Sequence, residues 1–439
     1  RDALPVNFTA VSRPILGAQG YMLTHSGLTH HADGVGIDRN GIFNENFKKH
    51  LRVSGEELIS VDSSGSVTSI GAISGTDRAS TQAYSTNTQA IVADGKMWLY
   101  DNTALTQITD SDLGAPIDIC WIDKYYFLTD GEYLYHTSIL DEYSIDPLQF
   151  SASDFSPDPV LGVAKTVDNQ VIVFNRYSTE WFINRATDNF AFQRIAGKSV
   201  KSGIVGTHCK AEIDGQFYVI GGGKEEAFSI HIVSAGSYLS IASREVDKIL
   251  ATYTEAQLSD AVLETRVENR DKFIVARLPN ETLLFNVTMA TVTGKDFAWT
   301  IVKSDVVGNT KWRGANGVLD PRIPSWVYGD NQDGRIGLLD GAVATQYGEQ
   351  VEQILYTPLL ELEMGSIDEL EVNSIPGHQV NVDNVTVAFS LTYDGLTYGQ
   401  EYWNLYGEQH RYGQRYIARR LGYVGDNVGF KLRCTSPER

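Results

Sequence analysis

The histidines of this chain are the first side chains to consider for chemistry, because a metal site or a general base often includes one. Nine are spread over the sequence, and none belongs to an HExxH or HxH pattern. His30 and His31, followed by Asp33, could offer two metal ligands, but adjacent histidines in a polar loop are usually only solvated. We therefore expect no metal site and no catalytic histidine.

Two glycine-containing stretches match ligand-binding loops only in part. Gly221-Gly222-Gly223-Lys224 lacks the GxxxxGK[ST] spacing of a phosphate-binding loop and is expected at a hairpin tip. Asp330-Asn331-Gln332-Asp333-Gly334 lacks the ligand spacing of a calcium loop and the glutamate that would complete it. Both stretches are expected to be turns. The sequence also contains no GxSxG nucleophile elbow.

A carbohydrate-active enzyme is the catalytic class that fits the sequence best, and its signals are incomplete. Residues 392–397 are close to the Asp-box of sialidase propellers, but they read Asp-Gly-x-Thr where the box has Asp-x-Gly-x-Thr, and they occur once. The carboxylate pair of a glycosidase cannot be assigned among 55 acidic residues. We expect a protein that is not an enzyme and has no catalytic residues, metal or cofactor.

The composition excludes further classes. A formal net charge of −19 argues against a general nucleic-acid-binding protein, which needs a basic face to neutralise phosphates. No apolar stretch is long enough to predict a transmembrane helix. Cys120, Cys209 and Cys434 form no CxxC pair and are expected to be buried free thiols, made in a reducing cytoplasm. Because the sequence begins with Arg1, we expect the natural N-terminus to lie upstream.

The elements that must position these residues are β-hairpins. Short polar tips, each followed by an alternating aromatic and aliphatic strand, recur along the chain, and such tips match the twist of paired strands. The tips are Asp94-Gly95-Lys96, Asp123-Lys124, Asp168-Asn169-Gln170, Asp214-Gly215-Gln216, Arg270-Asp271-Lys272 and Asp333-Gly334-Arg335. Their spacing is irregular, unlike that of a WD40 array, so the pattern predicts a degenerate β-propeller with long loops.

One segment, residues 243–263, breaks the β pattern. Val246, Ile249, Leu250 and Tyr253 follow the i, i+3, i+4, i+7 spacing of a helical stripe. Ser243 can cap its start, and Thr254 with the glutamine three residues later forms a second capping box. The segment therefore predicts two short helices packed on the β core.

The charge pattern changes after about residue 345. Residues 351–371 hold six acidic residues and no Lys or Arg, whereas residues 411–433 hold six basic residues and one acid. Long alternating strands here predict an antiparallel β-sandwich. Like charges along one strand repel unless they are paired, within one subunit or between subunits, and we favour a contact that lies partly between subunits. The candidate contact residues are Arg411, Arg415, Arg419, Arg420, Glu361 and Glu363.

Several strings, in order along the chain, resemble the packaged-DNA stabilisation proteins of P22-like short-tailed phages, the tail hub or nozzle family. Leu4-Pro5-Val6-Asn7 is similar to that family's N-terminal strand, and residues 203–210 to its central Gly-x-x-Gly-Thr-x-Cys-Lys string. Similar strings follow at Lys248-Ile249-Leu250, Tyr253-Thr254, Leu258, Leu278-Pro279, Gln346-Tyr347-Gly348, Tyr356-Thr357-Pro358-Leu359 and residues 427–433. Little beyond the N-terminal strand aligns in the first 200 residues.

The resemblance implies a structural virion protein of the phage tail that is made in the host cytoplasm. Such a protein forms a hexameric hub or nozzle below the portal–adaptor ring (the head-to-tail connector), carries the tail needle and borders the tailspikes. It extends and closes the DNA channel and retains packaged DNA, which passes without sequence-specific binding. We expect an acidic channel wall along which DNA slides.

The predicted fold is therefore all-β. We expect an N-terminal strand segment over residues 1–30 that joins a platform, a degenerate propeller over 31–345 and a C-terminal sandwich or platform over 346–439. Two alternatives stay open: a carbohydrate-active propeller enzyme, such as a glycan hydrolase, and a cellular propeller scaffold, which would show regular repeats.

Overall fold

The computed structural model describes residues 3–13, 20–81, 83–187, 189–308, 311–362, 364–374, 385–405 and 409–438. The chain divides into two compact units. We call them the propeller unit, which comprises His30–Pro279 and Gly314–Leu338, and the sandwich unit, which comprises Arg1–Thr29, Asn280–Arg313 and Leu339–Arg439.

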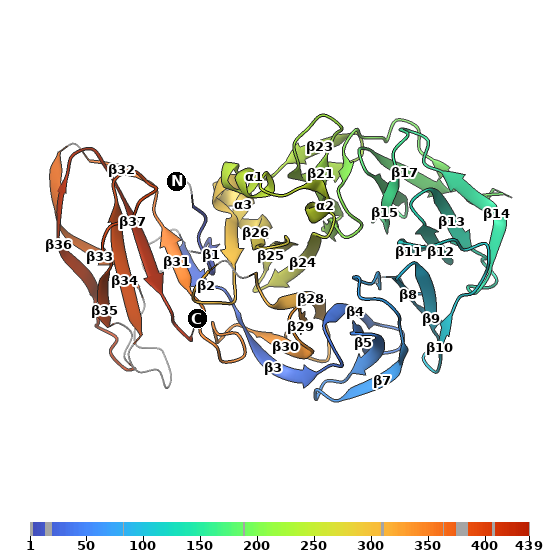
Figure 1. The fold of residues 1–439 in the computed structure, drawn as a ribbon, viewed down its shortest axis with the longest axis horizontal. Coiled ribbons are helices and arrows are strands. Elements are labelled where there is room, and N and C mark those ends of the chain that lie inside the picture. The colour runs from blue at the N-terminus through green and yellow to red at the C-terminus, as the bar shows by residue number, and fades with distance from the viewer. Residues whose placement is uncertain are drawn as a thin grey trace. The chain divides into compact units, whose positions relative to one another are not determined.

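The propeller unit consists of small antiparallel sheets that follow one another around a ring (Figure 1). The first three are β4 (Asp38–Asn44), β5 (Lys49–Ser54), β6 (Glu57–Val61) and β7 (Val67–Ala72); β8 (Gln89–Ala93), β9 (Lys96–Tyr100) and β10 (Leu105–Gln107); and β11 (Asp118–Ile122), β12 (Tyr125–Thr129), β13 (Tyr133–Thr137) and β14 (Ile145–Ala152). The next two are β15 (Val160–Lys165), β16 (Val171–Asn175), β17 (Thr179–Asn184) and β18 (Phe192–Arg194); and β19 (Gly203–Ile204), β20 (Lys210–Ile213), β21 (Gln216–Gly222), β22 (Ser229–Ser234) and β23 (Ser237–Ser240).

The ring is completed by a hairpin and a last sheet. The hairpin is β24 (Val262–Glu268) with β25 (Asp271–Arg277), and the last sheet has the order β28 (Gly314–Leu319), β29 (Trp326–Asp330), β30 (Arg335–Asp340) and β3 (Gly27–Asp33). Within the described residues this makes seven blades. Because β3 comes from near the N-terminus, an early strand completes the last blade, which closes the ring without an exposed seam.

The core of the propeller unit lies between neighbouring blades. In β8, Ile91 and Ala93 pack toward β5 and β6, while Ala90 and Val92 pack toward β11 and β12. Successive side chains of a strand point to opposite faces, and here both faces are covered by another sheet. This explains why the inner strands are apolar almost throughout.

The six predicted hairpin tips are confirmed, and each connects two antiparallel strands. At the tip between β8 and β9, Asp94 and Gly95 have φ values of 51° and 64°. The tip between β11 and β12 has the same form, with Asp123 at 51° and Lys124 at 71°. Two successive residues with positive φ define the type I′ turn, whose twist matches that of the paired strands.

The helical insert is also confirmed. It contains α1 (Arg244–Leu250), capped by the Ser243 side chain, and α2 (Glu255–Leu258), which begins with the capping box of Thr254. The residues at 30–33, in contrast, were expected in a polar loop and lie in strand β3. Sheet pairing with β30 outweighs the low strand propensity of this polar stretch.

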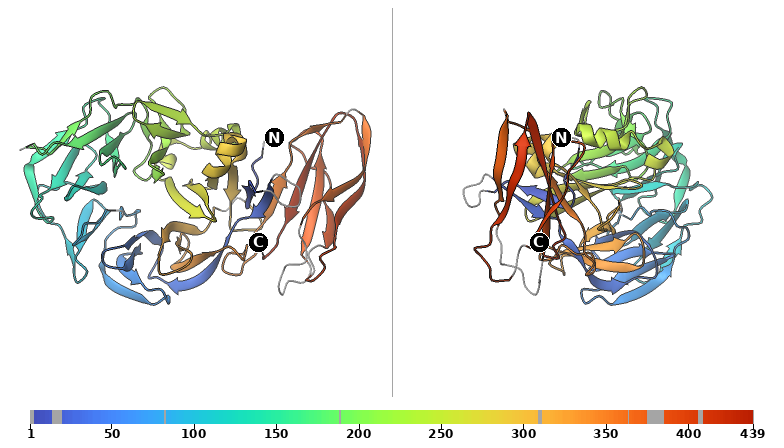
Figure 2. Two further views of the ribbon diagram at one scale, coloured as in Figure 1. Left: turned by 180° about the vertical axis from the view of Figure 1, so that it is seen from behind. Right: turned by 60° about the vertical axis from the view of Figure 1, so that its left-hand side comes forward.

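The sandwich unit contains an N-terminal hairpin, a short helical region and two facing sheets (Figures 1 and 2). The elements before the sandwich are β1 (Phe8–Val11), β2 (Tyr21–Thr24), β26 (Thr282–Asn286), α3 (Val287–Thr293), the 3-10 helix η1 (Lys295–Phe297) and β27 (Trp299–Val302). The sandwich strands are β31 (Gln353–Tyr356), β32 (Leu360–Glu361), β33 (Gly365–Val372), β34 (Thr386–Thr392), β35 (Tyr402–Leu405), β36 (Tyr416–Val424) and β37 (Asn427–Cys434).

One sheet of the sandwich has the order β31-β37-β34-β35, with β32 beside β37, and the other is the pair β33-β36. Phe389 and Phe430 stack at 5.4 Å between ring centres and form part of the core between the sheets. Tyr416 and Val424 contribute to the same core from β36. The predicted antiparallel sandwich is therefore confirmed.

A candidate assembly surface on the C-terminal sandwich

The candidate residues of the sandwich lie mainly on the β33-β36 sheet. The inner side chains of β36, such as Ala418 and Leu421, belong to the sandwich core, whereas Arg419 and Arg420 between them are exposed. On β33 the outward residues Glu369 and Glu371 are exposed as well. The alternation of strand side chains thus directs the charged residues to solvent.

The acidic and basic strands pair within the chain. Arg415 donates from Nε to Glu371 Oε1 at 2.6 Å and also contacts the second carboxylate oxygen. Arg419 donates from Nε to Glu369 Oε2 at 3.1 Å. The hydrogen bond from Arg415 lowers the pKa of Glu371. Because these pairs are exposed to water, they contribute little to folding and stay available for exchange with another partner.

Arg420 differs from its neighbours. It lies in a β-bulge between the Ile367 and Glu369 register positions, with a φ of 58°, and forms no ion pair with a described residue. A bulge re-aims side chains and interrupts regular pairing, so the bulge separates this guanidinium from the cross-strand pairs. Its charge is available to a partner.

The remaining candidates are more scattered. Arg411 precedes β36, and its carbonyl accepts a hydrogen bond from the Gln414 backbone. Glu361 is exposed in β32, which pairs with β37 rather than with β36. Glu363 lies outside the described residues. The structure thus brings together Arg415 and Arg419 with acidic partners, and the participation of all six candidates in a contact between copies stays a prediction.

Exposed apolar side chains of the sandwich, on both of its sheets, were not found by the sequence reasoning. All four residues of β35 are exposed, and Trp403 keeps 53% of its surface accessible. Across the sandwich the large exposed apolar residues are Leu359, Leu360, Leu362, Met364, Tyr393, Leu396, Tyr402, Trp403, Leu405, Tyr412 and Tyr423. Apolar surface gathered in this way marks interaction sites on many proteins. The sequence signal for these residues was the Tyr-Trp-x-Leu run. Strand alternation alone predicts that half of its side chains are buried, whereas all four residues are exposed.

The support for this surface is a buried ion network at the base of the sandwich. Asn7 donates to the carbonyls of Lys303 and Glu352, and its Oδ1 accepts from the Lys303 backbone N–H. Lys303 Nζ lies 2.5 Å from Glu352 Oε2, and Arg433 Nη1 lies 3.6 Å from the other carboxylate oxygen. Val6 bridges both Ile301 and Ile354. The N-terminal strand therefore fastens β27 to β31 within the sandwich unit.

The stretches with possible chemistry are strands and turns, and the expected turn at 221–224 is wrong for Gly221 and Gly222, which end strand β21. In the residues that the structure describes, no group of three or more His, Cys, Asp or Glu side chains could hold a metal ion. The Asp394 carboxylate accepts hydrogen bonds from the side chain and backbone of Thr397 and from the Leu396 backbone, which lower its pKa. Residues 331–334 connect β29 to β30 as a turn, and Gly223 and Lys224 begin the loop after β21.

The cysteines are free thiols. Cys209 is fully buried, and its Sγ donates to the carbonyls of Leu258 and Ala261 next to α2. Cys120 is buried as well, but Cys434 is only half-buried, so the expectation of burial is wrong for this residue. It is the last residue of β37, where the strand pairs with β31 and β34. Among the described residues, no helix combines the length and the apolarity that crossing a membrane requires.

Two solved structures that are similar to this chain have TM-scores below 0.5. The WD40 domain of Neurospora crassa Pan2 gives a TM-score of 0.47 at 6% identity and covers 72% of this chain and 97% of its own. Virginiamycin B lyase from Staphylococcus aureus gives 0.45 at 9% identity and covers 69% of this chain and 94% of its own.

Comparison with protein families covers nearly the whole chain. The model described as "Bacteriophage P22 Gp10, beta-propeller" matches residues 1–344, and "Bacteriophage P22 Gp10, beta-sandwich" matches residues 352–439. The tail hub protein gp10 of Salmonella phage P22 is 27% identical over 98% of this chain and 92% of its own length. The two family models thus match the propeller and the sandwich in turn. The chain belongs to the bacteriophage P22 Gp10 family and is a structural protein of the phage tail.

Proposed function

We propose that six copies of this protein form the tail hub, or nozzle, of a short-tailed phage. The ring extends the DNA channel below the portal–adaptor ring, closes it after packaging and so retains the packaged DNA. The observation that carries this proposal is the match of the chain, through both folds, to the family of the P22 tail hub protein.

The sandwich surface supports contacts between copies. A closed ring needs a heterologous contact, in which one face of a subunit meets a different face of the next. The β33-β36 sheet combines an exposed aromatic side chain, Tyr423, with the unpaired Arg420 and with exposed ion pairs that can exchange partners. A mixture of apolar and charged groups is typical of specific protein interfaces. We propose that this surface forms one half of the contact.

The role assigned here is mechanical. The tail needle, the tailspike and the portal–adaptor ring are the proposed neighbours, and the protein acts without catalysis. A ring of subunits that each carry −19 charges repels phosphates, so DNA passes through the channel without sequence-specific binding, along an acidic wall. We also propose that residues 1–30, 31–345 and 346–439 behave as the N-terminal segment, the propeller domain and the sandwich domain.

The test is the solution mass of the purified chain, alone and with isolated portal–adaptor complexes. Six copies of a 48.5 kDa chain give a ring of about 290 kDa, which light scattering or native mass spectrometry resolves. We expect this mass either in free solution or on the portal–adaptor complex. A chain that stays monomeric in both conditions would contradict the hub.

A charge-reversal pair locates the contact. The Arg419→Glu, Arg420→Glu double variant should lose the ring, whereas Arg185→Glu, Lys224→Glu, which makes the same charge change at exposed positions of the propeller unit, should keep it. Circular dichroism establishes that both variants are folded. If the first variant assembles as well as the second, the sandwich surface is not the contact, while the hub itself stands on the mass measurement.

Retention of DNA is tested in infected cells. Particles made without this protein should package DNA and then lose it to added nuclease, and complementation with the intact gene should restore protection. Full particles that resist nuclease without the protein would show that another component closes the channel.

A further inference from the structure

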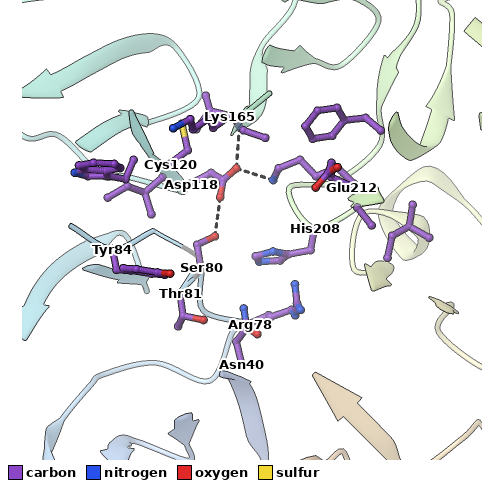
Figure 3. Close-up of a pocket in the computed structure, with 18 of the residues that line it drawn as sticks. Asn40, Arg78, Ser80, Thr81, Tyr84, Asp118, Cys120, Lys165, His208 and Glu212 are labelled. Atoms are coloured by element: carbon purple, nitrogen blue, oxygen red, sulfur yellow. Dashed lines mark hydrogen bonds and ion pairs between the residues drawn. The ribbon is translucent and has the colours of Figure 1, made fainter. Parts of the chain in front are cut away.

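The propeller unit contains a solvent-accessible cavity of about 530 Å³, lined by both polar and apolar side chains. Its wall is made by residues of successive blades, among them Asn40 of β4, Asp118 of β11 and Lys165 of β15 (Figure 3). His208 and Arg78 lie on the segments that precede β20 and β8. Cavities between 300 and 1,000 Å³ hold small-molecule ligands in many proteins, and this one lies outside every surface assigned above.

One carboxylate in the wall is already neutralised. Asp118 accepts hydrogen bonds from Ser80 Oγ at 2.7 Å, from the Val163 backbone N–H at 2.8 Å and from Lys210 Nζ at 2.6 Å (Figure 3). The carboxylate and the ammonium therefore cancel each other, and neither leaves a net charge for a ligand. Glu212, which is exposed, accepts from the Gly215 N–H of its own hairpin turn.

Arg78 is a cation of the cavity that has no ion partner among the described residues. Its Nε donates to Asn316 Oδ1 at 2.9 Å, and no carboxylate of a described residue lies within 4.0 Å of its guanidinium. Burial lowers the pKa of Arg78 to about 10, against the attraction of Glu264. The group is charged at neutral pH and only partly buried, so it can reach a ligand in the cavity, and a partly desolvated charge without an ion partner costs some folding free energy that a bound anion would recover.

The surroundings hold this guanidinium in place, and the acids that attract it, Glu264, Asp38 and Asp118, lie beyond ion-pair distance. Asn316, which accepts from Arg78, is itself fixed because its Nδ2 donates to Asp38 Oδ1 at 2.7 Å. Glu264 Oε1 and Oε2 accept from the backbone N–H groups of Asn316 and Gly317, and Arg277 Nη1 lies 3.2 Å from Oε1. The nearest acidic side chain thus has its own partners.

His208 adds a neutral wall beside Arg78. Burial lowers the pKa of His208 well below its usual value, and the ring donates a hydrogen bond to the Arg78 carbonyl. Lys165 is exposed at the cavity, with its ammonium 5.7 Å from the centre of the Trp121 ring. A cation thus lies on the solvent side of the cavity and a second, unpaired one lies inside it.

We propose that this cavity binds a small-molecule oxyanion, whose carboxylate or phosphate group accepts hydrogen bonds from the Arg78 guanidinium. The planar fork of N–H donors on an arginine matches two oxygens of such a group, and the hydroxyl groups of Thr81, Ser85 and Tyr84 line the space for the rest of the ligand. The inference is independent of the proposed hub function, since the cavity belongs to each propeller unit by itself.

Isothermal titration calorimetry of the full chain tests the proposal with three probes: inorganic phosphate, glucuronate and neutral glucose. We expect saturable binding, one per chain, of at least one of the two anions and none of glucose. Phosphate alone would assign the site to phosphate esters, and glucuronate alone to carboxylates. No saturable binding of either anion up to about 50 mM, far above the dissociation constant of a micromolar or even a millimolar site, would overturn the proposal.

Two variants assign the binding to the cavity. Arg78→Gln should weaken the anion at least tenfold, whereas Arg185→Gln, at an exposed position of the same unit, should leave it unchanged. Should Arg78→Gln fail to fold, Lys165→Glu changes only an exposed side chain and should weaken the anion at least threefold, with a shallower dependence of its affinity on salt than in wild type. Wild-type affinity in a folded Arg78→Gln chain, or in Lys165→Glu, would refute the site.

Discussion

His50 gives the sharpest test of the propeller's buried charges. It is fully buried on β5, where Arg52 Nη1 lies 3.1 Å from its Nε2 and Asp320 Oδ2 lies 3.5 Å from its Nδ1. The arginine donates, so Nε2 must be the lone-pair nitrogen of a neutral ring. Burial lowers the pKa of His50 from 6.5 to about 4, and the nearby Arg52 charge acts in the same direction. Protonation would place a new N–H against a guanidinium.

The lowered pKa makes stability depend on pH. The unfolded chain binds a proton at His50 near pH 6.5, whereas the folded chain does so only near pH 4. The unfolded state therefore holds more protons within this window, and the free energy of unfolding falls as the pH drops from 6.5 to 4. A difference of about 2.5 pKa units corresponds to about 3 kcal/mol, with a slope of roughly 1 kcal/mol per pH unit near pH 5.

The assay is urea unfolding of wild type and His50→Gln at pH 7, 6, 5 and 4.5, with His410→Gln as the control at an exposed histidine. Glutamine keeps an oxygen that can accept from Arg52 but does not titrate in this range. We expect His50→Gln to reduce the fall in stability between pH 6.5 and 4 by about 3 kcal/mol relative to wild type, and the control to keep the full fall. An equal fall in His50→Gln and wild type would refute the assignment of this proton to His50.

Three further predictions follow from the contacts. The exposed Arg415–Glu371 pair should show a coupling free energy of about 0.5 kcal/mol or less in a double-mutant cycle measured by urea unfolding. A coupling free energy above about 2 kcal/mol would mean that the pair is shielded from solvent. Gly206→Ala should destabilise the propeller by about 1–3 kcal/mol or more, because a Cβ there would lie 2.0 Å from the Ser259 carbonyl oxygen. Thermal unfolding measures this loss of stability. The control is Gly236→Ala, where a Cβ meets open space and only a small cost is expected, from the positive φ of Gly236. In the folded chain at pH 8, a thiol reagent should label Cys434 slowly and leave Cys209 unlabelled. Burial raises the pKa of both thiols to about 12, and of the two only Cys434 is partly exposed. Rapid labelling of Cys209 would contradict its packing next to α2.

The features that could be predicted from sequence are those with a local cause. An Asp-Gly pair fits positive φ wherever it stands, so the tip at Asp214-Gly215 was recognisable without knowledge of its partners. The capping box at Thr254 is local in the same sense. The number of blades, in contrast, depends on which strands join one sheet, and irregular loops hide that grouping from any count of spacings.

The features that were missed depend on distant residues. Residues 287–293 read Val-Thr-Met-Ala-Thr-Val-Thr, a β-branched run that favours a strand, yet they form α3 because Asn286 caps the start through the Met289 N–H. His30 and His31 lie in β3 because β30, some 300 residues later, pairs with that segment. On the sandwich, composition revealed the opposite charges, while the register that sets Glu369 beside Arg419 came only with the folded sheet.

The placement of β3 has a consequence for how this protein is made. The strand leaves the ribosome early, but its neighbour β30 begins at residue 335. At roughly 5–20 residues per second, the early strand waits about 15–60 s before its partner exists. Throughout that interval its backbone groups can pair with the wrong edge, including that of another nascent chain. Pairing of β3 with β30 thus closes the ring and stabilises the finished protein. The same arrangement leaves the nascent chain most prone to aggregation until β30 has been synthesised.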